Sequence, residues 1–114
     1  MINYEIDELK LIIAKAKTAA NKASREYLDV TLKGEDNYPC GFAWVSILGV
    51  KGNTKLGRNM KAAGIEQDYT KAFQIWNPGN VNVQNVDVKE AGATAAADVF
   101  TSYGFKAYSG SRLD

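Results

Sequence analysis

The sequence contains no histidine, and this absence removes a large class of catalytic and metal sites. Without an imidazole there is no Ser–His or Cys–His nucleophile and no zinc site that needs a histidine ligand. Acid–base chemistry would fall to Asp, Glu, Lys, Tyr or Cys, and the sequence contains no triad-like grouping of these residues. The sequence therefore favours a non-catalytic protein without a metal or other cofactor. An enzyme built without histidine is the less favoured alternative.

Cysteine and long apolar runs are also scarce. The single cysteine, Cys40, excludes an internal disulfide, and its place at the start of an apolar segment favours burial over reactivity. No run approaches the roughly 18 apolar residues of a membrane-spanning helix. Residues 1–10 carry three acidic side chains and lack the basic start of a signal peptide. We therefore expect a cytoplasmic protein that does not enter a membrane.

Length and charge set further bounds. The chain has 114 residues, of which 46% are hydrophobic and 24% are charged, as in ordinary globular proteins. This length predicts a single domain over residues 1–114 that needs no disulfide or metal for stability. The 14 basic residues nearly balance the 13 acidic ones, which argues against nucleic acid or membrane binding over the whole surface.

Residues 5–31 have the pattern of one long N-terminal helix. Ile12, Ala16, Ala19, Ala23 and Tyr27 recur at intervals of three or four residues, which is the period of an apolar helix face. Because this stripe is mostly alanine, it suits close packing against another helix or a flat sheet.

The rest of the chain alternates strand and helix patterns. Strands are predicted at residues 40–48, 71–76, 81–85 and 105–108, and helices at residues 53–63 and 87–103. The second and third strands would form a hairpin, and Asp87 with Glu90 resembles a capping box at the start of the last helix.

This order predicts the fold class. The series β-α-β-β-α-β over residues 40–108 is the split arrangement of ferredoxin-like folds. We therefore predict an α+β protein of that topology, preceded by the long helix and followed by a polar tail at residues 109–114. Residues 40–48 are apolar at both parities, so both faces of this strand need cover. We expect the front helix, or a second subunit of a homo-oligomer, to cover the face that the internal helices leave open.

A basic segment is the first candidate site. Residues 51–64 contain four cationic side chains and no acidic one, and they include the start of the predicted short helix. The free N–H groups and the positive dipole end of a helix N-terminus favour an anion. The segment predicts a phosphate or carboxylate site formed by Lys51, Asn53, Thr54, Lys55 and Arg58, although the spacing of a P-loop is absent. The alternative is a capped surface helix whose cations are solvated.

The two tryptophans fall on neighbouring predicted strands. In RNA-recognition domains of the same topology, strands one and three carry exposed aromatics that stack on bases, but residues 81–85 contain no aromatic. We therefore predict core packing for Trp44. Trp76 and Asn77, beside a predicted turn, are candidates for contacts with the ring or apolar part of a ligand. Arg112 in the tail would close over its anionic group.

Several short runs carry a resemblance. Residues 39–45 (PCGFAWV), residues 52–58 (GNTKLGR), the run Trp76-Asn77-Pro78 and residues 110–114 resemble small uncharacterised proteins of tailed-phage genomes. The resemblance covers residues 38–114 and leaves the front helix outside it. It implies an accessory phage protein that acts inside a bacterial host cell, and it assigns no functional residue.

Together these features predict a non-catalytic phage accessory protein that binds a small anionic ligand, such as a nucleotide or nucleotide-derived signal. Two alternatives stay open. One is an inhibitor that binds a host protein through the front helix or a sheet face. The other is a nucleic-acid binder that uses the basic patch at residues 51–64, with an affinity that falls steeply as salt rises.

Overall fold

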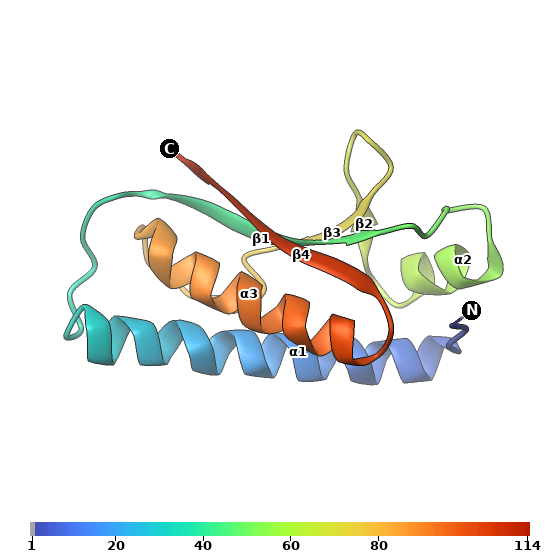
Figure 1. Ribbon diagram of the computed structural model, residues 1–114, viewed down its shortest axis with the longest axis horizontal. Coiled ribbons are helices and arrows are strands. Elements are labelled where there is room, and N and C mark those ends of the chain that lie inside the picture. The colour runs from blue at the N-terminus through green and yellow to red at the C-terminus, as the bar shows by residue number, and fades with distance from the viewer. Residues whose placement is uncertain (1) are drawn as a thin grey trace.

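The computed structural model describes residues 2–114 and has an α+β architecture, which confirms the predicted class (Figure 1). The elements in chain order are α1 (Ile6–Glu26), which continues into a π-helical turn (Tyr27–Thr31), β1 (Gly41–Leu48), α2 (Lys55–Ala62), β2 (Glu66–Gln67), β3 (Phe73–Trp76), α3 (Val86–Ser102) and β4 (Lys106–Leu113). The long front helix, the first strand and both later helices lie close to their predicted ranges. Among the described residues, no helix is long and apolar enough to cross a bilayer.

The four strands form one antiparallel sheet in the order β2-β3-β1-β4. β1 is a central strand, and Trp44 at its middle lies opposite Trp76 of β3 and Gly110 of β4. Because β2 has only two residues, β3 has no strand beside it beyond Gln74. The last part of β3 is therefore a free edge.

The hairpin predicted between residues 71–76 and 81–85 is wrong. Residues 81–84 form no strand, and the isolated bridge between Cys40 and Asn85 joins this segment to the sheet. The neighbour of β3 is instead β2. The capping box predicted at Asp87 is also wrong, because Asn85 caps α3 by accepting a hydrogen bond from the Val88 N–H at 3.1 Å.

The predicted polar tail at residues 109–114 is wrong as well. β4 continues through Leu113 beside β1, and the Asp114 N–H donates to the Cys40 carbonyl at 3.0 Å. The strand gives Arg112 a fixed position opposite Phe42.

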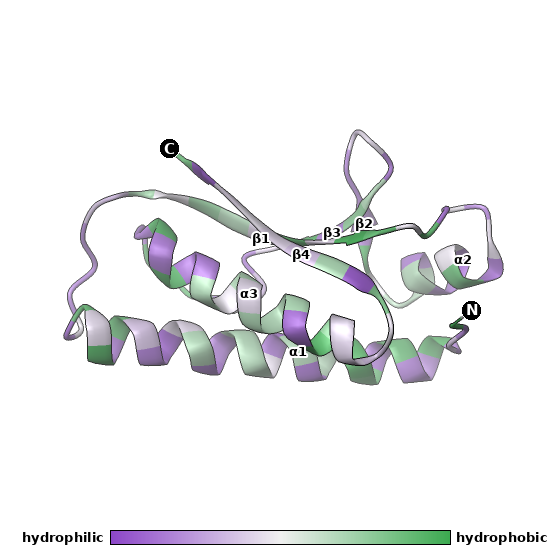
Figure 2. Cartoon of the chain, viewed as in Figure 1, coloured by the Kyte–Doolittle hydropathy of each residue, from purple (hydrophilic) through white to green (hydrophobic). Residues whose placement is uncertain are grey.

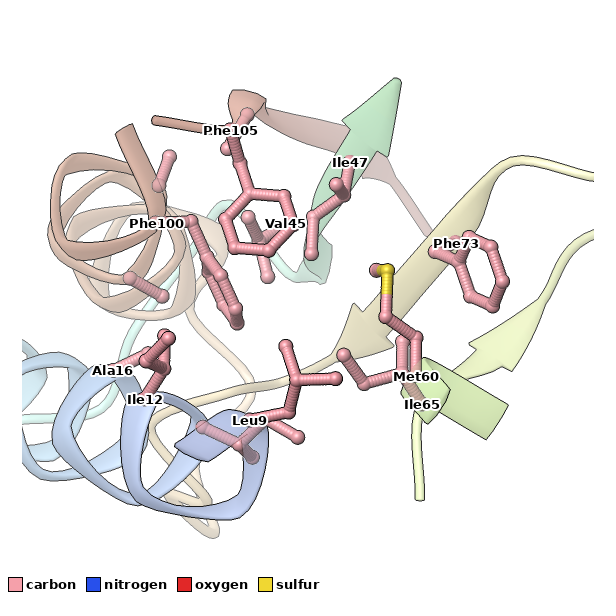
Figure 3. Close-up of a cluster of buried hydrophobic side chains, with 14 of the residues drawn as sticks. Leu9, Ile12, Ala16, Val45, Ile47, Met60, Ile65, Phe73, Phe100 and Phe105 are labelled. Carbon is pink, nitrogen blue, oxygen red and sulfur yellow. The ribbon is translucent and has the colours of Figure 1, made fainter. Parts of the chain in front are cut away.

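The core lies between one face of the sheet and the three helices (Figure 3). Val45 and Ile47 of β1 pack there with Leu9 of α1, Met60 of α2 and Phe100 of α3, and all five are buried. Figure 2 shows hydrophobic bands alternating with hydrophilic ones along α1, as expected for a helix that buries one side.

The front helix does not cover the open face of the sheet, so that part of the expectation is wrong, and cover by a second subunit stays a prediction. α1 and α3 lie on the same side of the sheet in Figure 1, and both contribute to the one core. The reason is that the buried stripe of α1 packs directly on α3. The opposite face, called the outer face below, is left uncovered by any described helix.

Small residues allow α1 and α3 to approach closely. The Ser24 hydroxyl donates to the Val88 carbonyl at 2.8 Å across this buried contact. A Cβ built on Gly92 would meet the Ser24 hydroxyl and lie 3.1 Å from the Ala20 carbonyl oxygen. The absence of a side chain at position 92 is therefore a requirement of the packing.

We expect Gly92→Ala to destabilise the protein, although alanine is the better helix former. In an exposed helix this exchange stabilises by about 1 kcal/mol. Here the added methyl group would push α1 away from α3, and such overpacking costs about 1–3 kcal/mol. Urea denaturation should show a lower free energy of unfolding. Thr101→Ala, an exposed exchange in α3, is the control, and a Gly92→Ala protein that is more stable than wild type would contradict this packing.

Candidate functional site

The outer face of the sheet carries a cluster of aromatic side chains. Because side chains alternate along a strand, Phe42 and Trp44 of β1 point to this face, while Ala43 and Val45 are buried in the core. Side chains directly opposite them in the sheet share the outer face, including Trp76 of β3 and Arg112 of β4. Trp76 is 48% exposed. We call Phe42, Trp44, Trp76 and Arg112 the outer-face cluster.

The three rings of this cluster are in mutual contact. The ring centroids of Trp44 and Trp76 are 5.0 Å apart, with 36° between the ring planes. Phe42 meets Trp76 edge-on at a centroid distance of 6.1 Å. Such pairs contribute about 0.5–1.5 kcal/mol beyond area burial, so the rings hold each other in position without a covering helix.

Neighbouring residues fix the two indole rings. A Cβ built on Gly110 would lie 2.6 Å from the Nε1 atom of Trp44, so the indole occupies space that any other residue would fill. The side-chain amide of Gln74 accepts from the Trp76 indole N–H and donates to Asp68 Oδ2 at 3.1 Å. Gly110 and Gln74 therefore determine how the two indole rings are oriented.

Two cations stand over the rings. The Arg112 guanidinium carbon is 5.4 Å from the Phe42 ring centroid and 5.8 Å from that of Trp76. Lys89 Nζ is 5.1 Å from the Phe42 centroid and donates to the Gly41 carbonyl at 2.9 Å. These are cation–π distances. Arg112 forms no ion pair with a described residue, so its charge remains available to an anion.

A hollow of about 840 Å³ borders the cluster along the free edge of β3. Trp44, Trp76 and Arg112 line this hollow on the sheet side, and Lys17 of α1 lines it as well. The hairpin between β2 and β3 forms another wall with Tyr69, which is 96% exposed. In Figure 1 this hairpin projects from the sheet on the side away from α1 and α3. The hollow has the size of small-molecule sites.

The Asp68 carboxylate holds the hairpin in shape. Its Oδ1 atom accepts hydrogen bonds from the Thr70 N–H at 2.7 Å, the Thr70 hydroxyl at 2.6 Å and the Ala72 N–H at 3.1 Å. The Thr70 hydroxyl is the main cause that holds the pKa of Asp68 below its ordinary value of 3.8. Desolvation acts in the opposite direction, and the Thr70 and Ala72 N–H groups lower the pKa further.

The predicted site residues fall into two groups, and the first lies at the start of α2. Thr54 is the N-cap and accepts from the Gly57 N–H at 3.1 Å. Lys55 Nζ is 3.4 Å from Glu5 Oε1, and Arg58 Nη1 donates to the Asn53 carbonyl at 2.6 Å. These contacts stabilise the start of α2. Lys51 and Asn53, the remaining members, line a second hollow beside the β2–β3 hairpin.

The second group contains the predicted residues outside the basic segment. Trp76 and Arg112 belong to the outer-face cluster and line the same hollow. Asn77 does not line it, because its Nδ2 atom donates to the Val81 carbonyl at 3.0 Å and its Oδ1 atom is buried without a partner among the described residues. The structure therefore brings Trp76 and Arg112 together and keeps both apart from the residues at α2.

Sequence reasoning missed two members of the cluster. The prediction of core packing for Trp44 is wrong, because Trp44 is only half-buried and lies on the outer face with Phe42. A signal was present in the sequence, since β1 alternates small or aliphatic residues with aromatic ones at positions 41–45. The apolar character at both parities hid that alternation.

The cluster contains groups for binding rather than for reaction. Among residues 2–114, no three Cys, Asp or Glu side chains come together as a metal site requires. Cys40, expected to be buried, is partly exposed, with its Sγ atom 3.4 Å from Gln84 Oε1. The outer face offers an apolar surface of three aromatic rings and an available guanidinium, which suit a ligand with a ring and an anionic group.

We expect the hairpin to loosen in acid because of Asp68. A carboxyl with a lowered pKa in the folded state adds stability above its unfolded pKa, and this stability is lost as pH falls through the lower folded value. The NMR signals of the Thr70 and Ala72 amides should therefore titrate together with a midpoint below pH 3.8. Asp68→Asn should remove this step and Asp98→Asn should keep it. A midpoint above 3.8 would contradict the assigned hydrogen bonds.

Comparisons with protein-family models, with curated proteins and with solved structures found no match to this chain, so the chemistry of the site rests on its own geometry.

Proposed function

We propose that this protein is a non-catalytic binding protein that takes a nucleotide on the outer face of its sheet. The base would stack on Trp76 beside Trp44, and the phosphate would pair with Arg112. One observation carries the proposal: two indole rings that no helix covers lie 5.0 Å apart, with the Arg112 guanidinium 5.8 Å from the Trp76 ring. A nucleotide has both of the groups that this arrangement can bind.

The chemistry of each side chain favours this ligand. Stacking of a base on an aromatic side chain contributes about 1–3 kcal/mol. The planar guanidinium of Arg112 can donate two parallel hydrogen bonds to a phosphate. Residues 81–85 form no strand, so their lack of an aromatic side chain does not argue against base stacking. β1 and β3 are neighbours, and each carries a tryptophan at the same level of the sheet.

We further infer a ferredoxin-like topology for the sheet and its helices. The strand order β2-β3-β1-β4 supports it, as does the position of α2 between β1 and β2 and of α3 between β3 and β4 in the chain. We also propose that the protein acts in a bacterial cytoplasm, as the resemblance to phage proteins implies. This compartment contains nucleotides and nucleotide-derived signals. The proposal requires an outer face that no second subunit covers.

We expect nucleotides to quench the intrinsic fluorescence of the protein. Both tryptophans of the chain belong to the outer-face cluster, so the signal reports this site alone. Trp76→Ala should weaken binding of a nucleoside monophosphate by about tenfold, given the usual contribution of a stacked base. Trp76→Phe should restore most of the affinity because it keeps a ring at this position.

The role of Arg112 is tested by comparing a nucleotide with its nucleoside. Arg112→Ala should weaken binding of the nucleotide and leave binding of the nucleoside nearly unchanged, because only the nucleotide carries the phosphate. Tyr38→Ala is the control, since Tyr38 is exposed and lies outside the hollow. The proposal fails if no nucleotide changes the fluorescence, or if the Trp76→Ala protein binds as tightly as wild type.

The double variant Lys55→Ala/Arg58→Ala tests whether the residues at α2 share this ligand. We expect an unchanged dissociation constant for the nucleoside monophosphate, because Lys55 pairs with Glu5 and Arg58 holds the Asn53 carbonyl. Neither residue lines the hollow that contains Trp76. The same fluorescence titration measures the constant, with thermal unfolding as a check of the fold. A large loss of affinity would return the phosphate to α2 and contradict its assignment to Arg112.

A further inference from the structure

A second hollow, of about 680 Å³, lies on the other side of the β2–β3 hairpin from the outer-face cluster. Three lysines from different segments line it: Lys51 follows β1, Lys61 belongs to α2, and Lys71 lies in the hairpin. No acidic side chain among the described residues lines this hollow. We call this second hollow the lysine hollow.

The lysines are brought together by backbone geometry. A Cβ built on Gly52 would lie 2.9 Å from both Lys61 Nζ and Gln67 Nε2, so these groups lie over the Gly52 backbone. Lys71 has a φ of 72° and is held by hydrogen bonds from its own N–H to the Asp68 carbonyl and from Gln67 Nε2 to its carbonyl. The Lys61 ammonium therefore lies over Gly52 in a hollow that Lys51 and Lys71 also line.

None of the three lysines forms an ion pair with another described residue. Like charges that line one hollow repel each other, and an anion bound there relieves the repulsion. Gln67, Asn53 and Thr70 add neutral hydrogen-bonding groups to the same walls. This combination fits the oxygen atoms of a phosphate.

The lysine hollow adjoins the first hollow, which borders the outer-face cluster. Gln67 lines both, and the β2–β3 hairpin stands between them. Trp76 lines the first and Ala72 the second, and these residues are about 13 Å apart at about 3.3 Å per residue of extended strand. A mononucleotide with its base on Trp76 and its phosphate at Arg112 leaves the lysines unoccupied. A ligand with further phosphates along a chain would reach them.

We propose that the natural ligand is a single-stranded nucleic acid, with a base on the tryptophan pair and neighbouring phosphates in the lysine hollow. This inference rests on the proposed function and names the class of ligand. Aromatic platforms combined with cations that follow the backbone are the general means of binding single strands. Tyr69, which is exposed in the hairpin loop and lines the hollow beside the outer-face cluster, offers a ring for a second base.

The test compares ligands of different length on the full chain. The probes are uridine and thymidine monophosphates and the corresponding oligonucleotides of about eight units, within the usual range of single-strand sites. Tryptophan quenching gives each dissociation constant at several salt concentrations. We expect the oligonucleotide, as RNA or DNA, to bind at least about tenfold more tightly than the monophosphate, with a salt slope of about −0.7 for each phosphate neutralised.

Lys61→Ala/Lys71→Ala should weaken oligonucleotide binding by about tenfold and reduce the salt slope by about 1.4, the value for two lost phosphate contacts. The monophosphate should bind this variant as it binds wild type. The control is Lys22→Ala/Lys33→Ala, which removes the same charge from residues that line neither hollow. This control should change neither the affinity nor the slope by as much.

The outcomes separate the two proposals. If the monophosphate binds but the oligonucleotide binds no more tightly, or if both lysine variants behave alike, the single-strand assignment is overturned and the nucleotide site stands. If neither probe quenches the fluorescence of the folded protein, both proposals are overturned. Stronger binding of the longer probe that depends on Lys61 and Lys71 supports the assignment, and the difference between RNA and DNA identifies the preferred sugar.

Discussion

The close contact between α1 and α3 determines how this protein divides its apolar surface. Gly92 and the Ala20–Ser24 segment of α1 let the two helix backbones approach, and the buried bond from Ser24 to the Val88 carbonyl locks the pair. With both helices on one side, the core includes only the odd-numbered side chains of β1. Phe42 and Trp44 are thereby left on a face without a cover. The site thus follows from helix packing on the opposite side of the sheet.

The sequence predicted well those elements that repeat a hydrophobic pattern over many residues or begin at a capping residue. α1 was predicted from its helical period, although its buried stripe continues from Ala16 through Ala20 and Ser24 instead of the predicted Ala19 and Ala23. Thr54 and Gly64 mark the limits of the region around α2. The sequence did not predict β2, because two residues are too few to show the alternating pattern of a strand. Its pairing with β3 depends on the hairpin that Asp68 holds in shape. Residues 81–85 alternate like a strand, yet Asn85 serves as a helix cap and bonds to the loop before β1. Local pattern and tertiary role differ there.

The candidate site was predictable in part. Trp76 and Arg112 were selected for chemistry that their positions support, although the strand that aligns Arg112 with Phe42 was not foreseen. The predicted site combined the cations near α2 with Trp76 and Arg112, because the sequence does not show how far apart these residues lie in the fold. Lys71 escaped notice because it is remote in the chain from Lys51 and Lys61, and the hairpin brings the three together. Proximity of this kind arises from topology and has no signature in a single sequence.

Gly110 shows how a missing side chain can determine the geometry of the outer-face cluster. The Trp44 indole occupies the space where a Cβ at this position would be, and it leans on β4 through that gap. A methyl group would tilt the indole and, through the contact between the rings, change the angle of Trp76 as well. Gly110 presents no side chain to a ligand. Selectivity among flat ligands could therefore be retuned by substitution at a residue that an inspection of ligand contacts would overlook.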